Sequence, residues 1–208
     1  MGSSTSRLQR SGAIGAADAV ALVGVMIVAA LLGVAMLAIG VFGVIHASTA
    51  DVVTLPQPVA AEIAVEPKSG TATLIEGIYR MADVAVAGLD AAPRALLAVS
   101  HGFSTTMYVA VSAAVIVLCI GLLRGRPFMP VIRRTVIATS GALIIGGMLS
   151  TGLLGFATME VADALNRPEF PLMANLDFTA PLVGVALALV ALAFSVGEKL
   201  QRDTDGLV

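Results

Sequence analysis

Four long runs of the chain contain no charged residue, and each is long enough to cross a lipid bilayer as a helix. They cover residues 19–45, 105–123, 135–159 and 180–197. A helix rises 1.5 Å per residue, so about 20 apolar residues cross the roughly 30 Å of hydrocarbon in a bilayer. Strands of a membrane barrel would alternate between apolar and polar residues, and these runs do not. The runs therefore predict four transmembrane helices, since a helix satisfies its own backbone in lipid.

The composition supports lipid as the solvent for much of the chain. Of the 208 residues, 58% are hydrophobic and only 12% are charged, whereas soluble domains carry about 25% charged residues. A soluble domain of this size could not hide so much apolar surface from water. We therefore expect an all-α integral membrane protein with one compact domain, a four-helix bundle.

Basic residues indicate how the chain is oriented. Eight of the 12 Lys and Arg lie in segments 1–18, 124–134 and 198–208, which hold only four of the 14 acidic residues. The connections 46–104 and 160–179 hold the other four basic and ten acidic residues. Because short cytoplasmic segments are enriched in Lys and Arg, we expect both termini in the cytoplasm and these two connections outside it. The predicted compartment is a bacterial inner membrane.

The N-terminus also imitates a signal peptide. Arg7 and Arg10 precede the first apolar run, and the small residues Ala47-Ser48-Thr49-Ala50 follow it. The apolar part of a signal peptide spans only 7–15 residues, however, and run 19–45 is much longer. An uncleaved first transmembrane helix is the better interpretation.

The connection 46–104 is the largest polar segment and is expected to form a small extracytoplasmic domain. Apolar and polar residues alternate over 51–66, and 71–78 is rich in β-branched residues, with turn-forming residues between them. This pattern predicts a β-hairpin. Asp90, followed by Ala91, Ala92 and Pro93, predicts a helix start. That helix would either lie on the membrane surface or continue into the second transmembrane helix.

Few residues could carry chemistry. None of the four runs contains Asp, Glu, Lys, Arg or His, which argues against a proton or ion relay but leaves a passive pore open. His46 and His101 both lie near the outer interface and could meet to bind a metal or haem. Two imidazoles without Cys or a clear carboxylate partner are weak support for a metal site. We therefore expect no metal or cofactor, and Cys119, the only cysteine, is expected to be a packing residue.

Small residues recur four apart in the third run, where they would let helix backbones approach closely in lipid. They are Ala142, Gly146 and Ser150, and beside them Gly147, Thr151 and Gly155. The pattern predicts helix packing, either within this chain or at the face of a homodimer or larger complex.

Two cytoplasmic segments carry short distinctive motifs. One is the turn Arg124-Gly125-Arg126-Pro127-Phe128-Met129-Pro130, which leads to the pair Arg133-Arg134. The other is the tail, Gly197-Glu198-Lys199-Leu200-Gln201-Arg202-Asp203-Thr204-Asp205-Gly206-Leu207-Val208. Both segments resemble those of the bacterial four-span membrane family called domain of unknown function 2975. Members of that family usually carry an Asn between the turn and the basic pair, where this chain has Pro130-Val131-Ile132.

The resemblance implies a four-span fold and a regulatory role, since some members look like partners of small helix-turn-helix regulators. It implies contact surfaces at Arg126, Pro127 and Phe128, with Arg133 and Arg134, and at the tail. The simpler interpretation of the same turn is a positive-inside connection.

We therefore predict a non-catalytic accessory or regulatory membrane protein that acts through contacts with other membrane proteins or with a second copy of itself. Its predicted surroundings are the lipid bilayer, and no nucleic-acid partner is expected. No nucleotide-binding loop, zinc helix or nucleophile elbow is present in the sequence. The alternative is a small transporter or channel. Its path could be lined only by hydroxyls at Ser112, Thr139, Ser140, Ser150, Thr151 and Ser195. A membrane enzyme would have only Glu160, Asp163, His46 and His101 to work with.

Overall fold

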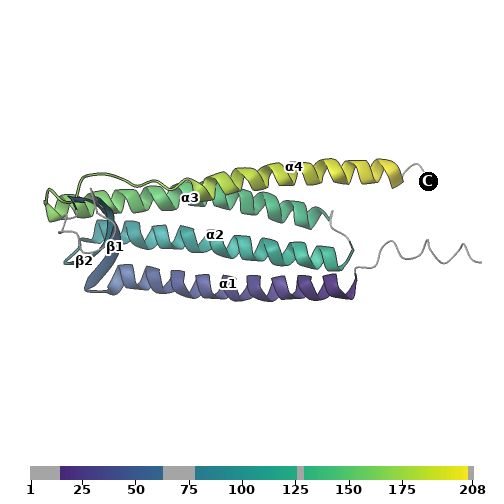
Figure 1. Ribbon diagram of the computed structural model, residues 1–208, viewed down its shortest axis with the longest axis horizontal. Helices are drawn as coiled ribbons and strands as arrows, with labels where there is room; N and C mark the ends of the chain where they lie inside the picture. Colours follow the sequence, from purple (N-terminus) through teal and green to yellow (C-terminus); the bar gives the residue numbers. More distant parts are fainter. Residues whose placement is uncertain (1–14, 63–77, 126–128, 206–208) are drawn as a thin grey trace, which may run out of the picture. The chain divides into compact units, whose positions relative to one another are not determined.

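The computed structural model describes residues 15–62, 78–125 and 129–205. These residues are mostly helical, and they also form a small antiparallel sheet (Figure 1). The helices are α1 (Ala16–Thr49), α2 (Ala91–Leu123), α3 (Pro130–Leu165) and α4 (Thr179–Asp205). The strands are β1 (Val52–Glu62) and β2 (Ile78–Ala87).

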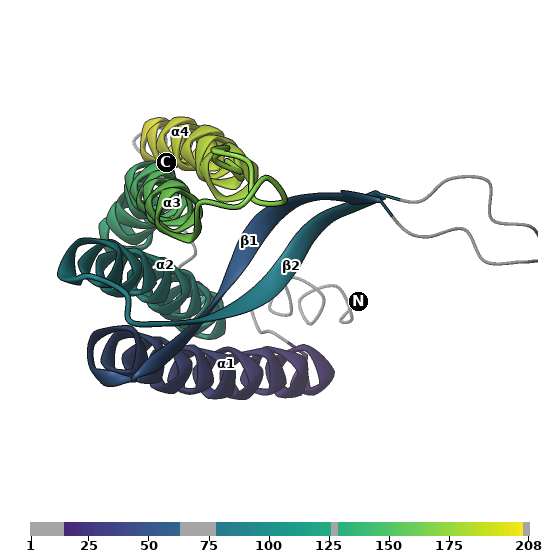
Figure 2. The same cartoon turned by 90° about the vertical axis from the view of Figure 1, so that its left-hand side faces the viewer.

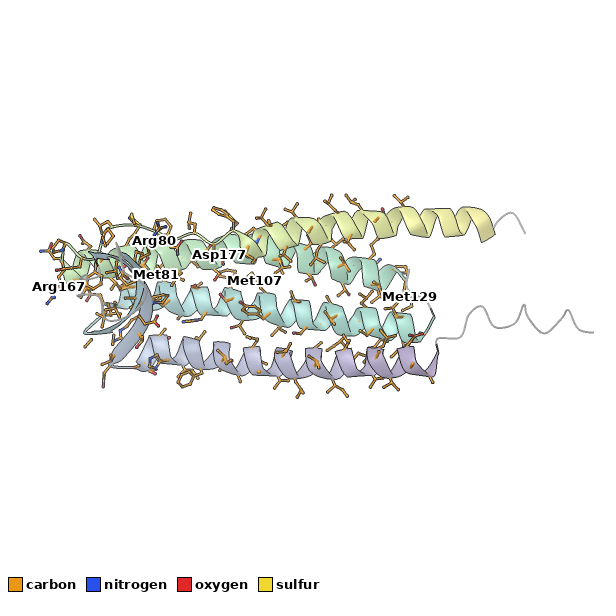
Figure 3. All side chains as sticks on the ribbon, viewed as in Figure 1. Arg80, Met81, Met107, Met129, Arg167 and Asp177 are labelled. Carbon is orange, nitrogen blue, oxygen red and sulfur yellow. The ribbon has the colours of Figure 1, made fainter. Side chains whose placement is uncertain are left out.

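All four helices are long and apolar enough to cross a membrane, α4 over its part Thr179–Gly197. Each charge-free run of the sequence lies within one of them. The four predicted helices are confirmed as helices long and apolar enough to cross a membrane, which suggests a multi-pass membrane protein. Exposed apolar side chains surround α1 in particular (Figure 3), as expected of a helix whose solvent is lipid rather than water.

Helix α2 begins where the sequence signal placed it. Asp90 precedes the first helical residue, Ala91, and Pro93 lies in the first turn, where its missing N–H removes no helical hydrogen bond. The helix then continues without a break to Leu123. The segment after Asp90 and the second apolar run are therefore one helix, which settles the alternative left open by the sequence.

Helix α3 extends beyond the charge-free run at both ends. It starts at Pro130, a favoured residue for the first helical position. It ends at Leu165, and the next residue, Asn166, has a φ of 45°. This left-handed conformation commonly closes helices, and Asn tolerates it better than most side chains. Glu160 and Asp163 end the apolar run but not the helix, because both side chains are exposed and exposed carboxylates do not disrupt a helix.

The two strands pair antiparallel, from Val52 opposite Ala87 to Glu62 opposite Ile78, with an irregularity between Pro58 and Ala61. Figure 2 shows them running side by side as a twisted ribbon. The predicted first strand, 51–66, is confirmed over β1. Of the predicted second strand, 71–78, only Ile78 lies within the described residues, and the described partner of β1 is β2, which the sequence did not predict.

Contacts divide the chain into two units. The first comprises Met1–Ala38, Thr105–Gly146 and Thr179–Val208, and the second comprises Ile39–Ser104 and Gly147–Phe178. The described part of the first unit consists mainly of helical segments, and its core contains Ile132, Val136 and Ala191. Met129, labelled in Figure 3, packs against this cluster from the position just before α3.

The second unit combines helix ends with the hairpin. Ala47 of α1, Val53 of β1, Leu97 of α2 and Ala157 of α3 form one buried cluster. Leu55, Val86 and Val161 form another, so both strands pack on α3. The hairpin therefore has the packing support that an isolated two-stranded sheet lacks.

Candidate functional site

The second unit contains a pocket of about 360 Å³ that is lined by both histidines of the chain and by three serines. We call it the histidine pocket. Its polar lining consists of His46, Thr54, Ser100, His101, Ser104 and Ser150. Its larger apolar lining residues are Ile39, Phe42, Val53, Leu55, Leu97 and Leu154. These side chains belong to four elements, α1, β1, α2 and α3.

A glycine brings the two histidines to the same wall of the pocket. Gly43 lies one turn before His46 on α1, and a Cβ added to Gly43 would lie 3.1 Å from Cγ and Nδ1 of His101. The His101 ring therefore packs directly on the α1 backbone, beside His46. The His46 ring stacks on Phe42, with ring centroids 5.7 Å apart and an interplanar angle of 15°. The result is a stacked pair of rings, Phe42 and His46, with the His101 ring on the same stretch of α1.

Three serines form the hydrogen-bonded part of the lining. The Ser100 hydroxyl donates to the carbonyl oxygen of Ser150 at 2.9 Å, and the hydroxyls of Ser104 and Ser150 are 2.6 Å apart. Ser100 and Ser104 are four residues apart on α2 and therefore lie on one helix face. The cluster joins α2 to α3. It also gives the buried hydroxyls of Ser100 and Ser150 hydrogen-bond partners.

The hairpin is tied to α3 and to the segment that follows it. Gln57 of β1 is completely buried, and its Nε2 donates to the carbonyl oxygen of Thr158 at 2.9 Å. The backbone N–H of Ala60 donates to the carbonyl oxygen of Glu169 at 2.9 Å. The Gln57 Oε1 atom is buried without a hydrogen-bond partner among the described residues. These bonds fix β1, whose residues 53–56 form one side of the pocket.

Two of the predicted packing residues of α3, Ser150 and Gly155, lie against other segments of the same chain. Gly146, Gly147, Ser150 and Gly155 are buried, and Ala142 and Thr151 are half-buried. Ser150 contacts α2 through its hydroxyl. At Gly155 an added Cβ would lie 2.8 Å from Cβ of Ala174, so its close neighbour is the segment after α3 rather than another helix.

The predicted cytoplasmic contact residues fall partly outside the described residues, which omit Arg126, Pro127 and Phe128. Arg133 and Arg134 lie in the first turn of α3, where Arg133 is half-buried and Arg134 is exposed.

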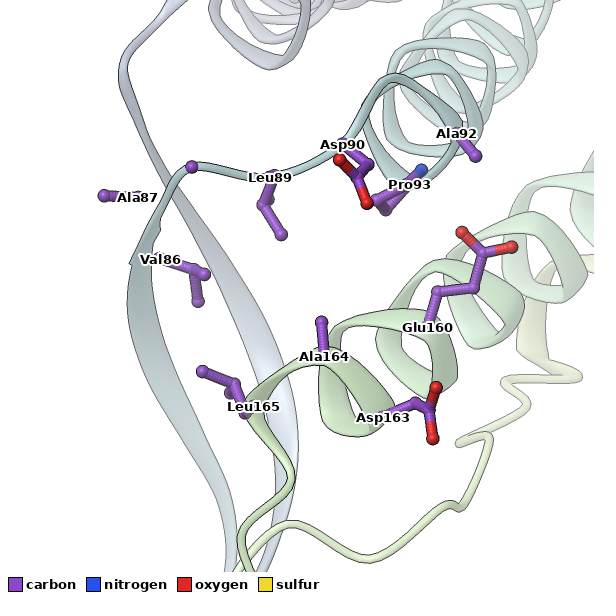
Figure 4. Close-up of a pocket in the computed structure, with 11 residues that line it drawn as sticks. Val86, Ala87, Leu89, Asp90, Ala92, Pro93, Glu160, Asp163, Ala164 and Leu165 are labelled. Carbon is purple, nitrogen blue, oxygen red and sulfur yellow. The ribbon is translucent and has the colours of Figure 1, made fainter.

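A second hollow of about 450 Å³ lies near the start of α2. Figure 4 shows Glu160 and Asp163 projecting from α3 and Asp90 at the start of α2. In the described ranges no three His, Cys, Asp or Glu residues are grouped so that they could hold a metal ion.

Of the six hydroxyl groups that could line a transport path, five form hydrogen bonds within the protein. Thr139 donates to the Ala110 carbonyl oxygen at 3.3 Å and Ser140 to that of Gly184 at 2.8 Å. Ser150 bonds within the serine cluster, as described above. Thr151 and Ser195 donate to carbonyl oxygens of their own helices, at Gly147 and Leu192. Ser112 lies against Gly33, where an added Cβ would be 2.9 Å from its own Cβ.

Several residues of the site were not singled out from the sequence. Ser100, Ser104 and Thr54, which line the pocket, are among them, and so is Gln57, which holds β1 to α3. The sequence held one signal for this part of the pocket, since Ser100, His101 and Ser104 place polar residues on adjoining faces of α2 just before the second apolar run. No sequence pattern indicated that this part of α2 lies near β1.

Comparison with protein-family models, with curated proteins and with solved structures finds no match for this chain. The resemblance of its cytoplasmic turn and tail to the four-span family therefore stays a prediction.

Proposed function

We propose that this protein is a non-catalytic accessory or regulatory component of a bacterial inner membrane, acting through contacts with other membrane proteins or a second copy of itself. The proposal rests on the hydrogen bonds that the hydroxyls of the apolar helices form. These hydroxyls bond either a neighbouring helix or the backbone of their own helix. Hydroxyls that bond between helices strengthen helix association in lipid.

This use of hydroxyls favours an accessory protein over the alternative, a small transporter or channel. A path for a polar solute needs hydrogen-bonding groups directed at that solute. Ser140 and Ser150 are buried and bonded within the protein. Opening them to a solute would break the contacts that hold α3 to α4 and to α2.

The proposed topology places both termini in the cytoplasm, with the hairpin and the segment 166–178 outside. The distribution of Lys and Arg supports it, as set out above. Because Cys119 is the only cysteine, a Cys119→Ser chain gives a clean background for labelling. Ser48→Cys should react with a membrane-impermeant maleimide added to intact cells, and Ser3→Cys should react only after the cells are opened. Labelling in the reverse order would contradict the topology.

The proposed contact surface is the cytoplasmic turn with the first turn of α3, together with the C-terminal tail. It follows from the family resemblance and from the four arginines that this short connection holds. Arg134 suits a test because it is exposed. Arg167, an exposed arginine in the segment after α3, provides a matched control at a different place in the chain.

The test is affinity purification of the tagged full chain from its native membrane in mild detergent, with quantitative mass spectrometry. We expect a partner in fixed stoichiometry that is lost with Arg134→Glu and retained with Arg167→Glu. If both variants and the wild type elute without a partner or a second copy, the accessory function is wrong. Solute flux through liposomes containing the purified chain would then support the transporter alternative.

A further inference from the structure

We propose that the histidine pocket binds a neutral, lipid-soluble quinone or quinol by its ring. This inference goes beyond the proposed function, because contacts between proteins neither require nor supply such a ligand. Three properties of the pocket carry it, namely its charge, its aromatic wall and its place on α1.

The charge of the lining selects for a neutral ligand. Among the lining residues that the structure describes, none is Lys, Arg, Asp or Glu. A fully charged ligand would lose its water without gaining a fixed counter-charge, which is costly. The lining instead offers the imidazole of His46 and the hydroxyl of Thr54 among apolar side chains, a composition typical of small-molecule sites. A volume of about 360 Å³ is also within the range of such sites.

The aromatic wall suits a flat ring that carries oxygens. Phe42 and His46 are stacked nearly parallel, so a third flat ring can extend the same stack. A neutral imidazole has one N–H donor and one acceptor nitrogen. His46 can therefore donate to a quinone carbonyl oxygen or accept from a quinol hydroxyl, so either redox form finds a partner.

The place of the pocket on α1 suits a ligand that arrives through lipid. Ile39 and Phe42 line the pocket, yet they are 63% and 67% exposed. Both belong to the charge-free run 19–45, whose exposed surface is apolar. The pocket therefore borders the lipid-facing surface of α1, while His46 and His101 lie just beyond the ends of their apolar runs. A quinone ring held there would keep its isoprenoid tail in the hydrocarbon.

The test uses the full chain in lipid nanodiscs and an azide-bearing decylubiquinone as photolabel. Mass spectrometry of the labelled peptides should place the label in segments 39–47 and 97–104. Unlabelled decylubiquinone should compete in a saturable way, and decylbenzene, which has a ring and tail without carbonyl oxygens, should not. Label spread over all exposed helix faces, or equal competition by decylbenzene, would overturn the proposal.

A variant adds an independent test. His46→Leu removes the imidazole and should weaken competition by decylubiquinone about three- to tenfold, the loss of one hydrogen bond. Ser48→Ala is the matched control on the same helix, because its hydroxyl bonds Val44 and it does not line the pocket. Circular dichroism of both variants checks that the helices form. Unchanged competition in a folded His46→Leu chain would contradict a ring held at His46.

Discussion

The guanidinium of Arg94 donates a hydrogen bond to the carbonyl oxygen of Ala50, with Nη1 and O 2.7 Å apart. The same nitrogen lies 3.5 Å from the carbonyl oxygen of Ala47, and Nε donates to that of Leu89 at 3.0 Å. The last carbonyl groups of a helix have no partner within it, and a cation near them also complements the helix dipole. One side chain at the start of α2 therefore closes the end of α1 and fixes the segment before α2.

Replacing Arg94 should loosen the second unit. Arg94→Met keeps much of the aliphatic length but leaves carbonyl oxygens near the end of α1 without their donor, which should cost about 1–3 kcal/mol. Thermal unfolding in mild detergent, followed by circular dichroism, measures the loss. Arg80→Met is the control, since Arg80 is exposed on β2. Equal changes in the two variants would show that Arg94 is only a surface charge.

Gln57 should tolerate an apolar replacement better than an acidic one. Gln57→Leu removes one hydrogen bond but also removes the buried, unpartnered Oε1, so its cost should stay within about 1 kcal/mol. Gln57→Glu puts a carboxylate into a completely buried position and should cost at least about 2 kcal/mol. Hydrogen exchange of β1 amides compares the two variants directly. Faster exchange in Gln57→Leu than in Gln57→Glu would contradict this account.

Two adjacent hydroxyls of α3 should differ in their effect on stability. Ser150 bonds across to α2, whereas Thr151 bonds the Gly147 carbonyl oxygen of its own helix. We expect Ser150→Ala to cost about 0.5–1.5 kcal/mol and Thr151→Ala to cost less. A double-mutant cycle with Ser104→Ala isolates the contact between the two helices. Zero coupling between Ser104 and Ser150 would contradict the 2.6 Å hydrogen bond.

Two helical glycines should respond to alanine with opposite signs. At Gly184 of α4 an added Cβ would lie 2.8 Å from Cγ1 and 3.0 Å from the backbone nitrogen of Ile144. Gly184→Ala must push α4 away from α3 and should cost about 1–3 kcal/mol. At Gly152 nothing lies within 4 Å of the added Cβ. Gly152→Ala should stabilise the helix by up to about 1 kcal/mol. Thermal unfolding of both variants checks the signs, and stabilisation by Gly184→Ala would contradict the close packing.

The helices could be predicted because lipid imposes a simple condition on the sequence. A charge-free run of this length has to satisfy its backbone internally, so runs such as 19–45 predict helices without knowledge of neighbours. The start of α2 was also predictable, because Asp90 and Pro93 act locally. Helix ends were less predictable. Glu160 stops the hydropathy signal, but the helix stops only at Asn166, where the backbone turns left-handed.

The second strand and the pocket depended on contacts between distant residues. β2 alternates only weakly, with Ala82, Asp83 and Ala85 among its residues, and it is fixed by pairing with β1 and by packing on Val161. His46 and His101 were expected near one interface, yet their meeting depends on Gly43, whose missing side chain admits the His101 ring. The bond between Gln57 and Thr158 joins residues 101 positions apart, and no local pattern signals it.

The most direct test of the proposed accessory function is the mass of the particle that the protein forms in its own membrane. Native mass spectrometry of vesicles from cells expressing the tagged full chain measures it without prior purification. We predict a complex of fixed composition that is heavier than the 21.0 kDa chain and contains a second protein or copy. Arg134→Glu should convert that complex to the single chain, and Arg167→Glu should leave it intact. A wild-type protein that appears only at the mass of one tagged chain with bound lipid would contradict a function based on protein contacts.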